Sequence, residues 1–221
     1  MQVIEALKQR KATRAFLPLE VNKEKISRIL DAARHAPSGT NTQPWQVAVV
    51  TGEKRRRLGH LMETAFRIGQ AGTMEFQYYP ETWEGIYKAR RRACGLQMYS
   101  TLNISREEKQ RQLDQWAANY RAFDAPVMMF FFIDPILEAG SYLDYGMFIQ
   151  SIMLMALEEG LATCPQAALG EYPAIVKQEL GYSEEIKLLV GLAMGYEDKS
   201  HIINSYRTPR ESVEQFTRFF E

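Results

Sequence analysis

Residues 126–134, PVMMFFFID, form a near-continuous run of apolar side chains. The run has the length of a strand, and a strand with one face in water would alternate apolar with polar residues. Because this run does not alternate, we predict a strand that is buried on both faces. Such a strand belongs in the interior of a sheet.

Other segments show weaker patterns, which predict two further strands and several helices. Two short β-branched runs predict two more strands, at 46–52 (QVAVVTG) and 186–198 (IKLLVGLAMGYED). A helix is predicted between Asn22, a favourable N-cap, and Pro37, with an apolar stripe of Ile26, Ile29, Leu30 and Ala33. Further helices are predicted at 53–74, 141–160 and 173–180.

The strongest of these helices is 141–160, which ends at Gly160, a natural C′ residue. Its apolar side chains surround nearly the whole helix, which indicates burial on several sides. A membrane span is excluded because the helix is interrupted by Asp144, Gln150 and Glu158. It is therefore a core helix, or a core helix that also packs against a second subunit. The apolar C-terminal tail, with Phe216, Phe219 and Phe220, likewise needs a surface to bury against.

Length and charge limit the function classes. The 221 residues predict one domain, 1–221, with a helical and loop excursion at about 75–125 that is rich in aromatic residues. With 27 Lys+Arg and 27 Asp+Glu there is no net charge to attract nucleic acid or an anionic membrane. Three scattered histidines give no metal motif, and the N-terminus lacks the apolar region of a secretory signal. We expect a cytoplasmic protein.

Residues 36–45, APSGTNTQPW, form a polar loop that directly follows a predicted helix. Pro37 and Pro44 exclude a helix here, and Gly39 and Asn41 favour turns. The loop is either ordinary solvated turn or a cradle for a polar ligand.

Two basic pairs stand at opposite ends of the chain. Arg10 and Arg14 share a helix face if the first helix continues through them, and Arg207 and Arg210 lie in YRTPR. Together they would suit a phosphate group, because the planar guanidinium matches phosphate oxygens. Taken singly, they are ordinary surface residues. We assign the RRR runs at 55–57 and 90–92 to solvated helix faces.

The segment CPQAALG (164–170) places Pro165 before the small residues Ala167 and Ala168. Small side chains let main-chain N–H groups approach a flat ligand. Cys164 could instead be a nucleophile, but no local signature supplies a histidine base, and a free cysteine is usually a small buried hydrophobe. We therefore favour the interpretation that Cys164 packs in the core.

Taken together, RKATR, PSGTNTQPW, CPQAAL and YRTPRE, in this order over nearly the whole chain, resemble the nitroreductase family of flavoproteins. YYPETW, the second RRR segment and FDAPV look like the subgroup related to nitrobenzoate reductases. The resemblance implies an α+β fold with a central, mainly antiparallel sheet flanked by helices. It also implies a homodimer with FMN at the subunit interface and a C-terminal extension that packs on the partner.

The resemblance also implies roles for individual residues. Arg10 and Arg207 would hold the FMN phosphate, and Arg14 would approach the N1/O2 edge of the ring. Ser38 would reach the flavin of the other subunit, and the main chain of Ala167 and Ala168 would bond N5 and O4. The full set of implied cofactor-binding positions is Arg10, Lys11, Ala12, Arg14, Pro37, Ser38, Gly39, Asn41, Gln43, Pro165, Gln166, Ala167, Ala168 and Arg207. Ala12 departs from the serine of many members and Lys11 from a common arginine.

The implied activity is reduction of nitroaromatic or quinone-like acceptors by NADH or NADPH in a ping-pong cycle. The chemistry would take place on FMN N5, so we assign no catalytic acid or base. One alternative is a protein that stores, senses or remodels FMN without reducing a nitro compound. Another is a flavin-free hydrolase that uses Cys164.

Overall fold

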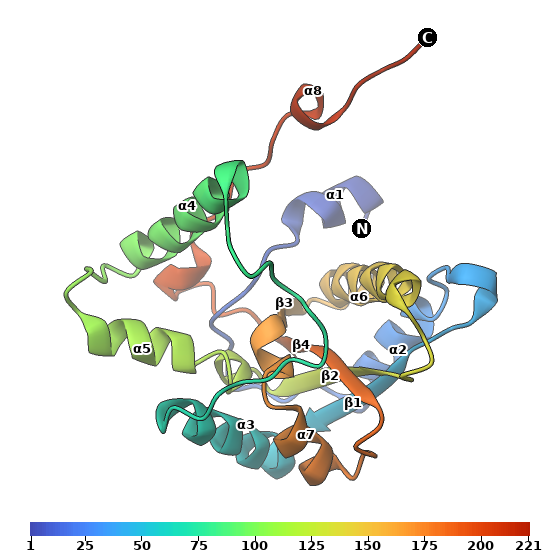
Figure 1. The fold of residues 1–221 in the computed structure, drawn as a ribbon, viewed down its shortest axis with the longest axis horizontal. Coiled ribbons are helices and arrows are strands. Elements are labelled where there is room, and N and C mark those ends of the chain that lie inside the picture. Colours follow the sequence, from blue (N-terminus) through green and yellow to red (C-terminus); the bar gives the residue numbers. More distant parts are fainter.

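Strand β2 (Val127–Ile133) lies in the interior of a four-stranded sheet in the computed structural model, which describes residues 1–221. The other strands are β1 (Gln46–Thr51), β3 (Ala162–Gln166) and β4 (Lys187–Gly195). Their spatial order is β1-β2-β4-β3, and every pairing is antiparallel. Helices lie on both sides of the sheet (Figure 1): α1 (Val3–Gln9), α2 (Lys23–Ala33), α3 (Gly52–Arg67), α4 (Gly85–Thr101), α5 (Lys109–Ala117), α6 (Ala139–Glu158), α7 (Pro173–Leu180) and α8 (Val213–Phe216).

The alternating side chains of β2 enter two separate cores. Met128, Phe130 and Phe132 pack with buried residues of α3 and α7 on one face. Val127, Met129, Phe131 and Ile133 pack with buried residues of α2 and α6 on the other. All seven residues of the strand are buried, which explains why the sequence does not alternate. The predicted strand and the α+β class, with an antiparallel sheet, are confirmed.

The structure contains one strand more than the sequence predicts. β3 carries Pro165, which cannot donate a ladder hydrogen bond. β3 lies at the edge of the sheet and pairs only with β4, so a proline is tolerated there. The strands predicted at 46–52 and 186–198 correspond to β1 and β4.

The first helix is shorter than the arginine pair requires. α1 ends at Gln9, and Arg10 has extended backbone angles (φ −55°, ψ 129°). Arg10 and Arg14 therefore do not share a helix face, and that expectation is wrong. They lie on an extended segment beside β3, where Ala12 bridges Thr163.

The predicted helices at 141–160 and after Asn22 are present as α6 and α2. The Asn22 side chain accepts a hydrogen bond from the N–H of Glu24 at 2.8 Å, as an N-cap does. One side of α6 packs on the sheet and α2, while Leu143 and Met147 remain exposed on the other side. No helix of the structure has the length and apolar character needed to span a membrane.

Two features extend from the sheet and its covering helices. Residues 75–125 contain α4 and α5, which lie to one side of the sheet (Figure 1). The C-terminal segment runs past α4 and ends away from the rest of the chain, with Phe216, Phe219 and Phe220 exposed (Figure 1).

Candidate active site

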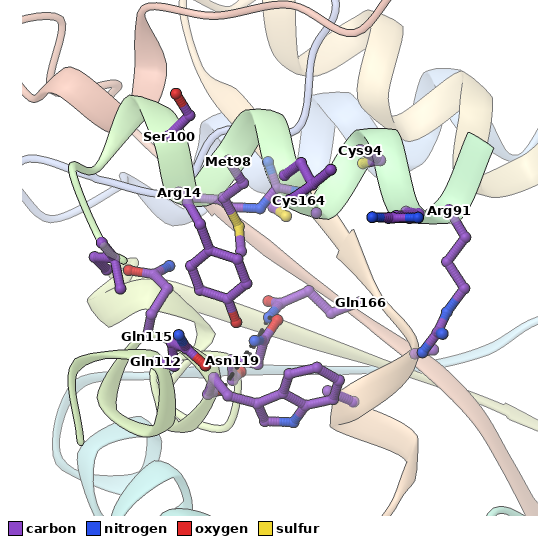
Figure 2. Close-up of a pocket in the computed structure, with 18 of the residues that line it drawn as sticks. Arg14, Arg91, Cys94, Met98, Ser100, Gln112, Gln115, Asn119, Cys164 and Gln166 are labelled. Carbon is purple, nitrogen blue, oxygen red and sulfur yellow. Dashed lines mark hydrogen bonds between the residues drawn. The ribbon is translucent and has the colours of Figure 1, made fainter. Parts of the chain in front are cut away.

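A cavity of about 930 Å³ lies between β3 and the helices α4 and α5. Its lining includes Arg14, the segment Cys164–Ala168, the α4 residues Arg91, Cys94 and Met98, the α5 residues Gln112 and Gln115, and Asn119 in the turn after α5. Figure 2 shows these side chains from separate parts of the chain facing one another. The cavity thus brings Arg14, from near the N-terminus, and the β3 segment together with the 75–125 excursion.

Arg14 is positioned by the C-terminal segment. The buried side chain of Asn204 accepts from the N–H of Arg14 at 2.9 Å and donates to the carbonyls of Ala15 and Asp198, each at 2.9 Å. The guanidinium of Arg14 donates to the hydroxyl of Tyr206 at 3.1 Å and makes no ion pair. A charged donor therefore faces the cavity without an acidic partner.

A second group of arginines, Arg10, Arg207 and Arg210, lies outside the cavity lining, with Arg10 near the lining residue Cys164. Burial, together with the nearby charges of Arg210 and Arg207, lowers the pKa of Arg10. The guanidinium of Arg207 donates to the carbonyls of Lys8 and Gln9, which places it against the end of α1. None of these three arginines has a carboxylate partner, although the chain as a whole is neutral. The two basic pairs predicted from the sequence thus meet through Arg10, Arg207 and Arg210.

The turn after β3 lies directly on β4. Residues Ala167–Gly170 form a single 3-10 turn, and the first N–H groups of such a turn have no partner within it. A Cβ added at Gly191 of β4 would lie 2.6 Å from Leu169, so only glycine permits this close packing. Ala167 and Ala168 are half-buried at the cavity wall.

Gln166 links β3 to the turn that follows α5. Its amide nitrogen donates to the carbonyl and to the side-chain oxygen of Asn119, at 3.0 and 3.2 Å (Figure 2). Asn119 in turn donates to the carbonyl of Trp116 at 2.9 Å. Gln166 is buried, and its Oε1 accepts no hydrogen bond. The cavity wall therefore contains a buried acceptor that lacks a donor.

The loop at 37–43 contributes no residue to the lining of the cavity. The N–H of Gly39 points to the buried carboxylate of Asp144 on α6, with both oxygens at 3.3 Å. Ser38 accepts from the N–H of Gln43 at 3.0 Å, and Asn41 and Gln43 are exposed. Positive φ angles at Thr40 (49°), Asn41 (59°) and Gln43 (47°) show an unusual backbone, which is costly for the β-branched Thr40. Pro37 is exposed at the start of the loop.

Two other predicted residues, Lys11 and Ala12, do not line the cavity. Lys11 forms an ion pair with Glu197 at 2.6 Å and donates to the carbonyl of Asn204. Ala12 is half-buried beside Thr163. Of the predicted positions, the structure thus brings together Arg14 with Pro165–Ala168, and Arg10 with Arg207.

Cys164 has none of the features of a nucleophile. It belongs to the apolar core on the α3 and α7 side, and burial raises the pKa of its thiol to about 11. No histidine lines the cavity. The packing interpretation fits these observations, whereas a hydrolase based on Cys164 does not.

Several residues that line the cavity or support its lining lay outside the sequence predictions. Asn204 and Tyr206 do not line it but hydrogen-bond Arg14, and they belong to the NSYR sequence that ends at Arg207. Arg91 and Arg92, assigned above to a solvated helix face, are exposed but line the cavity. Asn119 and Gln115 carried no signal, because only the fold brings α5 and the turn after it to β3.

Comparison with known proteins agrees with this arrangement. The model of the nitroreductase family matches residues 7–196. The chain is 36% identical over 210 residues to a 4-nitrobenzoate reductase of Pseudomonas putida, covering 95% of this chain and 92% of that protein. It is 37% identical over 213 residues to the nitroreductase NfnB of Mycolicibacterium smegmatis, covering 96% of this chain and 90% of that protein.

The fold is also shared with solved structures. The FMN- and NADPH-dependent nitroreductase NfnB from Sphigopyxis sp. strain HMH superposes with a TM-score of 0.96 at 35% identity, over 100% of both chains. The FMN-dependent NfnB from Mycobacterium smegmatis in complex with NADPH gives a TM-score of 0.92 at 35% identity, again over 100% of both chains. The resemblance inferred from the four motifs is thereby confirmed, and the chain belongs to the nitroreductase family.

Proposed function

We propose that this protein uses NADH or NADPH to reduce nitroaromatic or quinone-like compounds in a ping-pong cycle. As a nitroreductase-family member it is an FMN-dependent NAD(P)H oxidoreductase. The acceptors and the order of the cycle are our proposal. In such a cycle the nicotinamide compound and the acceptor occupy the cavity in turn.

Arg14 and the Ala167–Ala168 turn line one cavity, and the Arg10–Arg207–Arg210 group lies outside that lining but adjoins it through Cys164; this arrangement carries the proposal. A phosphate monoester has a charge near −2 at neutral pH, and three arginines without acidic partners suit such a group. We therefore assign the FMN phosphate to Arg10 and Arg207, with Arg210 beside them. A bound phosphate would also offset the burial and the repulsion from Arg210 and Arg207 that together lower the pKa of Arg10.

The residues at the ring end also fit a flavin. The N–H groups at the start of the Ala167–Ala168 turn would donate to acceptors on the ring edge, and the unpartnered Oε1 of Gln166 would accept from a ligand N–H. When bound, FMN supplies reversible hydride transfer. Arg14 would stabilise the negative charge of the reduced ring, since it faces the cavity without an ion-pair partner.

We further propose a homodimer. Large apolar side chains are exposed on α6 (Leu143, 74% and Met147, 40%) and on the tail (Phe219, 82% and Phe220, 89%). Exposed apolar side chains mark an interaction surface where they form a contiguous patch, and we infer such a patch here. A partner on this surface would also explain why the strained loop at 37–43 avoids the cavity of its own chain, since it would serve the partner's cavity. The two free cysteines accord with a cytoplasmic location.

Anaerobic spectroscopy of the FMN-loaded protein tests the proposal. The yellow flavin absorbance is expected to bleach on addition of NADPH or NADH and to return on addition of a nitroaromatic compound. Bleaching without reoxidation by any nitroaromatic or quinone would contradict the proposed reductase activity and favour a flavin-storing role. A protein that binds no FMN would contradict the site itself.

A further inference from the structure

The wall of the cavity formed by α4 carries an excess of positive charge. Five cationic residues line the cavity, Arg14, Lys88, Arg91, Arg92 and Arg106, against one acidic residue, Glu171. None of the five has a carboxylate partner within 4.0 Å. The Glu171 carboxylate itself accepts from the Tyr120 hydroxyl at 2.5 Å. In a protein without net charge, this cavity is a local anion-attracting region.

The charge is not spread evenly along α4. Lys88, Arg91 and Arg92 follow i, i+3, i+4 spacing and so share the helix face toward the cavity, one to two turns after the helix begins at Gly85. Further along the same face the cavity is lined by Gly95, Met98 and Tyr99. The face is thus cationic at one end and uncharged at the other. From Lys88 to Tyr99 it spans about 16 Å at 1.5 Å per residue.

Aromatic rings accompany the cationic end. The guanidinium of Arg91 lies 5.4 Å from the ring centre of Trp83, and Tyr79 and Trp83 lie 5.7 Å apart. Both rings line the cavity, and Trp83 and Tyr87 also line an adjoining hollow of about 460 Å³. Ring faces beside unpaired cations suit a purine that carries phosphate groups, since bases stack on aromatic side chains.

We propose that Lys88, Arg91 and Arg92 bind phosphate groups on the adenosine half of the nicotinamide nucleotide, including the 2′-phosphate, and so make the protein prefer NADPH to NADH. This rests on the proposed function. The uncharged end of α4, beside Arg14 and Ala167, leaves room for the nicotinamide ring near the flavin. A carboxylate on an acidic acceptor shares this anion chemistry, and the experiment separates the two sources.

The first measurement is calorimetric binding of adenosine 2′,5′-bisphosphate and of AMP to the FMN-loaded protein. We expect the bisphosphate to bind at least about tenfold more tightly than AMP, because each charge-assisted hydrogen bond is worth roughly a factor of ten or more. The double variant Lys88→Gln/Arg92→Gln should remove this difference. Arg56→Gln, an exposed arginine on α3 paired with Glu53, is the matched control and should keep it.

The second measurement is the anaerobic reduction of the bound flavin in the same variants. NADPH should lose at least about tenfold in apparent affinity in the double variant, while NADH loses less, and added salt should reduce the NADPH advantage of the wild type. Equal losses with both nucleotides would overturn the assignment of the 2′-phosphate.

Two other results would also overturn the proposal. A loss seen only when 4-nitrobenzoate, and not nitrobenzene, reoxidises the flavin would assign these cations to the acceptor. A larger FMN dissociation constant in the double variant, which means weaker FMN binding, would assign these cations to the flavin phosphate. A wild-type protein that binds no FMN would instead refute the proposed function, which keeps the two failures distinct.

Discussion

Lys177 Nζ lies 2.6 Å from Glu75 Oε1, and the Lys177 side chain is only 1% exposed. Lys177 also donates to the carbonyl of Glu184 at 2.9 Å, and the second oxygen of Glu75 accepts from the N–H of Leu188 at 2.6 Å. Glu75 stands at the start of the excursion, whereas Lys177 is on α7 and Leu188 on β4. One carboxylate therefore ties the excursion that walls the cavity to the sheet.

Replacing Glu75 with Ala should reduce the free energy of unfolding by about 3 kcal/mol, because it leaves the Lys177 ammonium buried and unpaired. The measurement is urea unfolding of the FMN-loaded protein. The control is Lys54→Ala, which removes an exposed lysine from Glu179 (3.3 Å); Glu179 keeps its pair with Arg57, so the cost should be about 0–1 kcal/mol. Equal losses in the two variants would show that the buried pair has no special role.

Gly191→Ala should destabilise the protein by about 1–3 kcal/mol, the usual cost of overpacking. The added Cβ would lie 2.6 Å from Leu169 and 3.0 Å from the carbonyl of Met129, so the Ala167–Ala168 turn must shift. We expect weaker FMN binding as well, measured by flavin fluorescence. Gly140→Ala, where no atom lies within 4 Å of the added Cβ, should leave both quantities nearly unchanged. Wild-type FMN binding in Gly191→Ala would separate this turn from the flavin site.

Much of the fold follows from local patterns. β2 was predictable because both of its faces are buried, and α2 because Asn22 caps an apolar stripe. β3 was not, since its proline is permitted only by an edge position that the pairing with β4 decides. The end of α1 was also misjudged, because nothing in the local sequence stops the helix at Gln9.

The site depends on contacts between distant residues. The resemblance pointed to Arg14 and Gln166, but their partners Asn204 and Asn119 lie 190 and 47 residues away in the chain. Hydrophobic periodicity carries no information about such pairs. The cationic face of α4 was misread for a related reason: a basic run looks the same on a solvated helix and on a cavity wall.

The two cysteines should differ in reactivity toward iodoacetamide. Cys94 is exposed, whereas burial raises the pKa of Cys164 to about 11, so at pH 8 only about one Cys164 thiol in a thousand is ionised. Mass spectrometry should find Cys94 alkylated first and Cys164 only near pH 11 or after unfolding. Since the pKa of Cys164 is higher in the folded than in the unfolded state, its contribution to stability is lost as the pH rises from about 9 to about 11. Early labelling of Cys164 at pH 8 would contradict its burial.

Arg207→Ala should weaken FMN binding by about 1.5–3 kcal/mol, the value of one charge-assisted hydrogen bond to the phosphate. Riboflavin, which lacks the phosphate, should bind the variant and the wild type alike. This comparison removes any general effect of losing the contacts of Arg207 with Lys8 and Gln9. The control variant is Arg56→Ala, whose ion pair with Glu53 is exposed and on α3. An FMN dissociation constant unchanged in Arg207→Ala would remove Arg207 from the site.

Leu143→Asp should convert the proposed dimer into a monomer. Leu143 is 74% exposed on the outer face of α6, so a charge there costs little in the separate chain but would be buried unpaired in an interface. Light scattering after size-exclusion chromatography gives the mass, for which the 25.5 kDa chain is the reference. FMN affinity should fall together with the mass, because the loop that carries Ser38 would no longer reach the partner's cavity.

The control is Ile68→Asp, at an equally exposed position (74%) after α3, which should leave both the mass and the FMN affinity unchanged. A dimer that persists in Leu143→Asp would place the interface elsewhere, and a monomer that keeps wild-type FMN affinity would assign the whole flavin site to one chain.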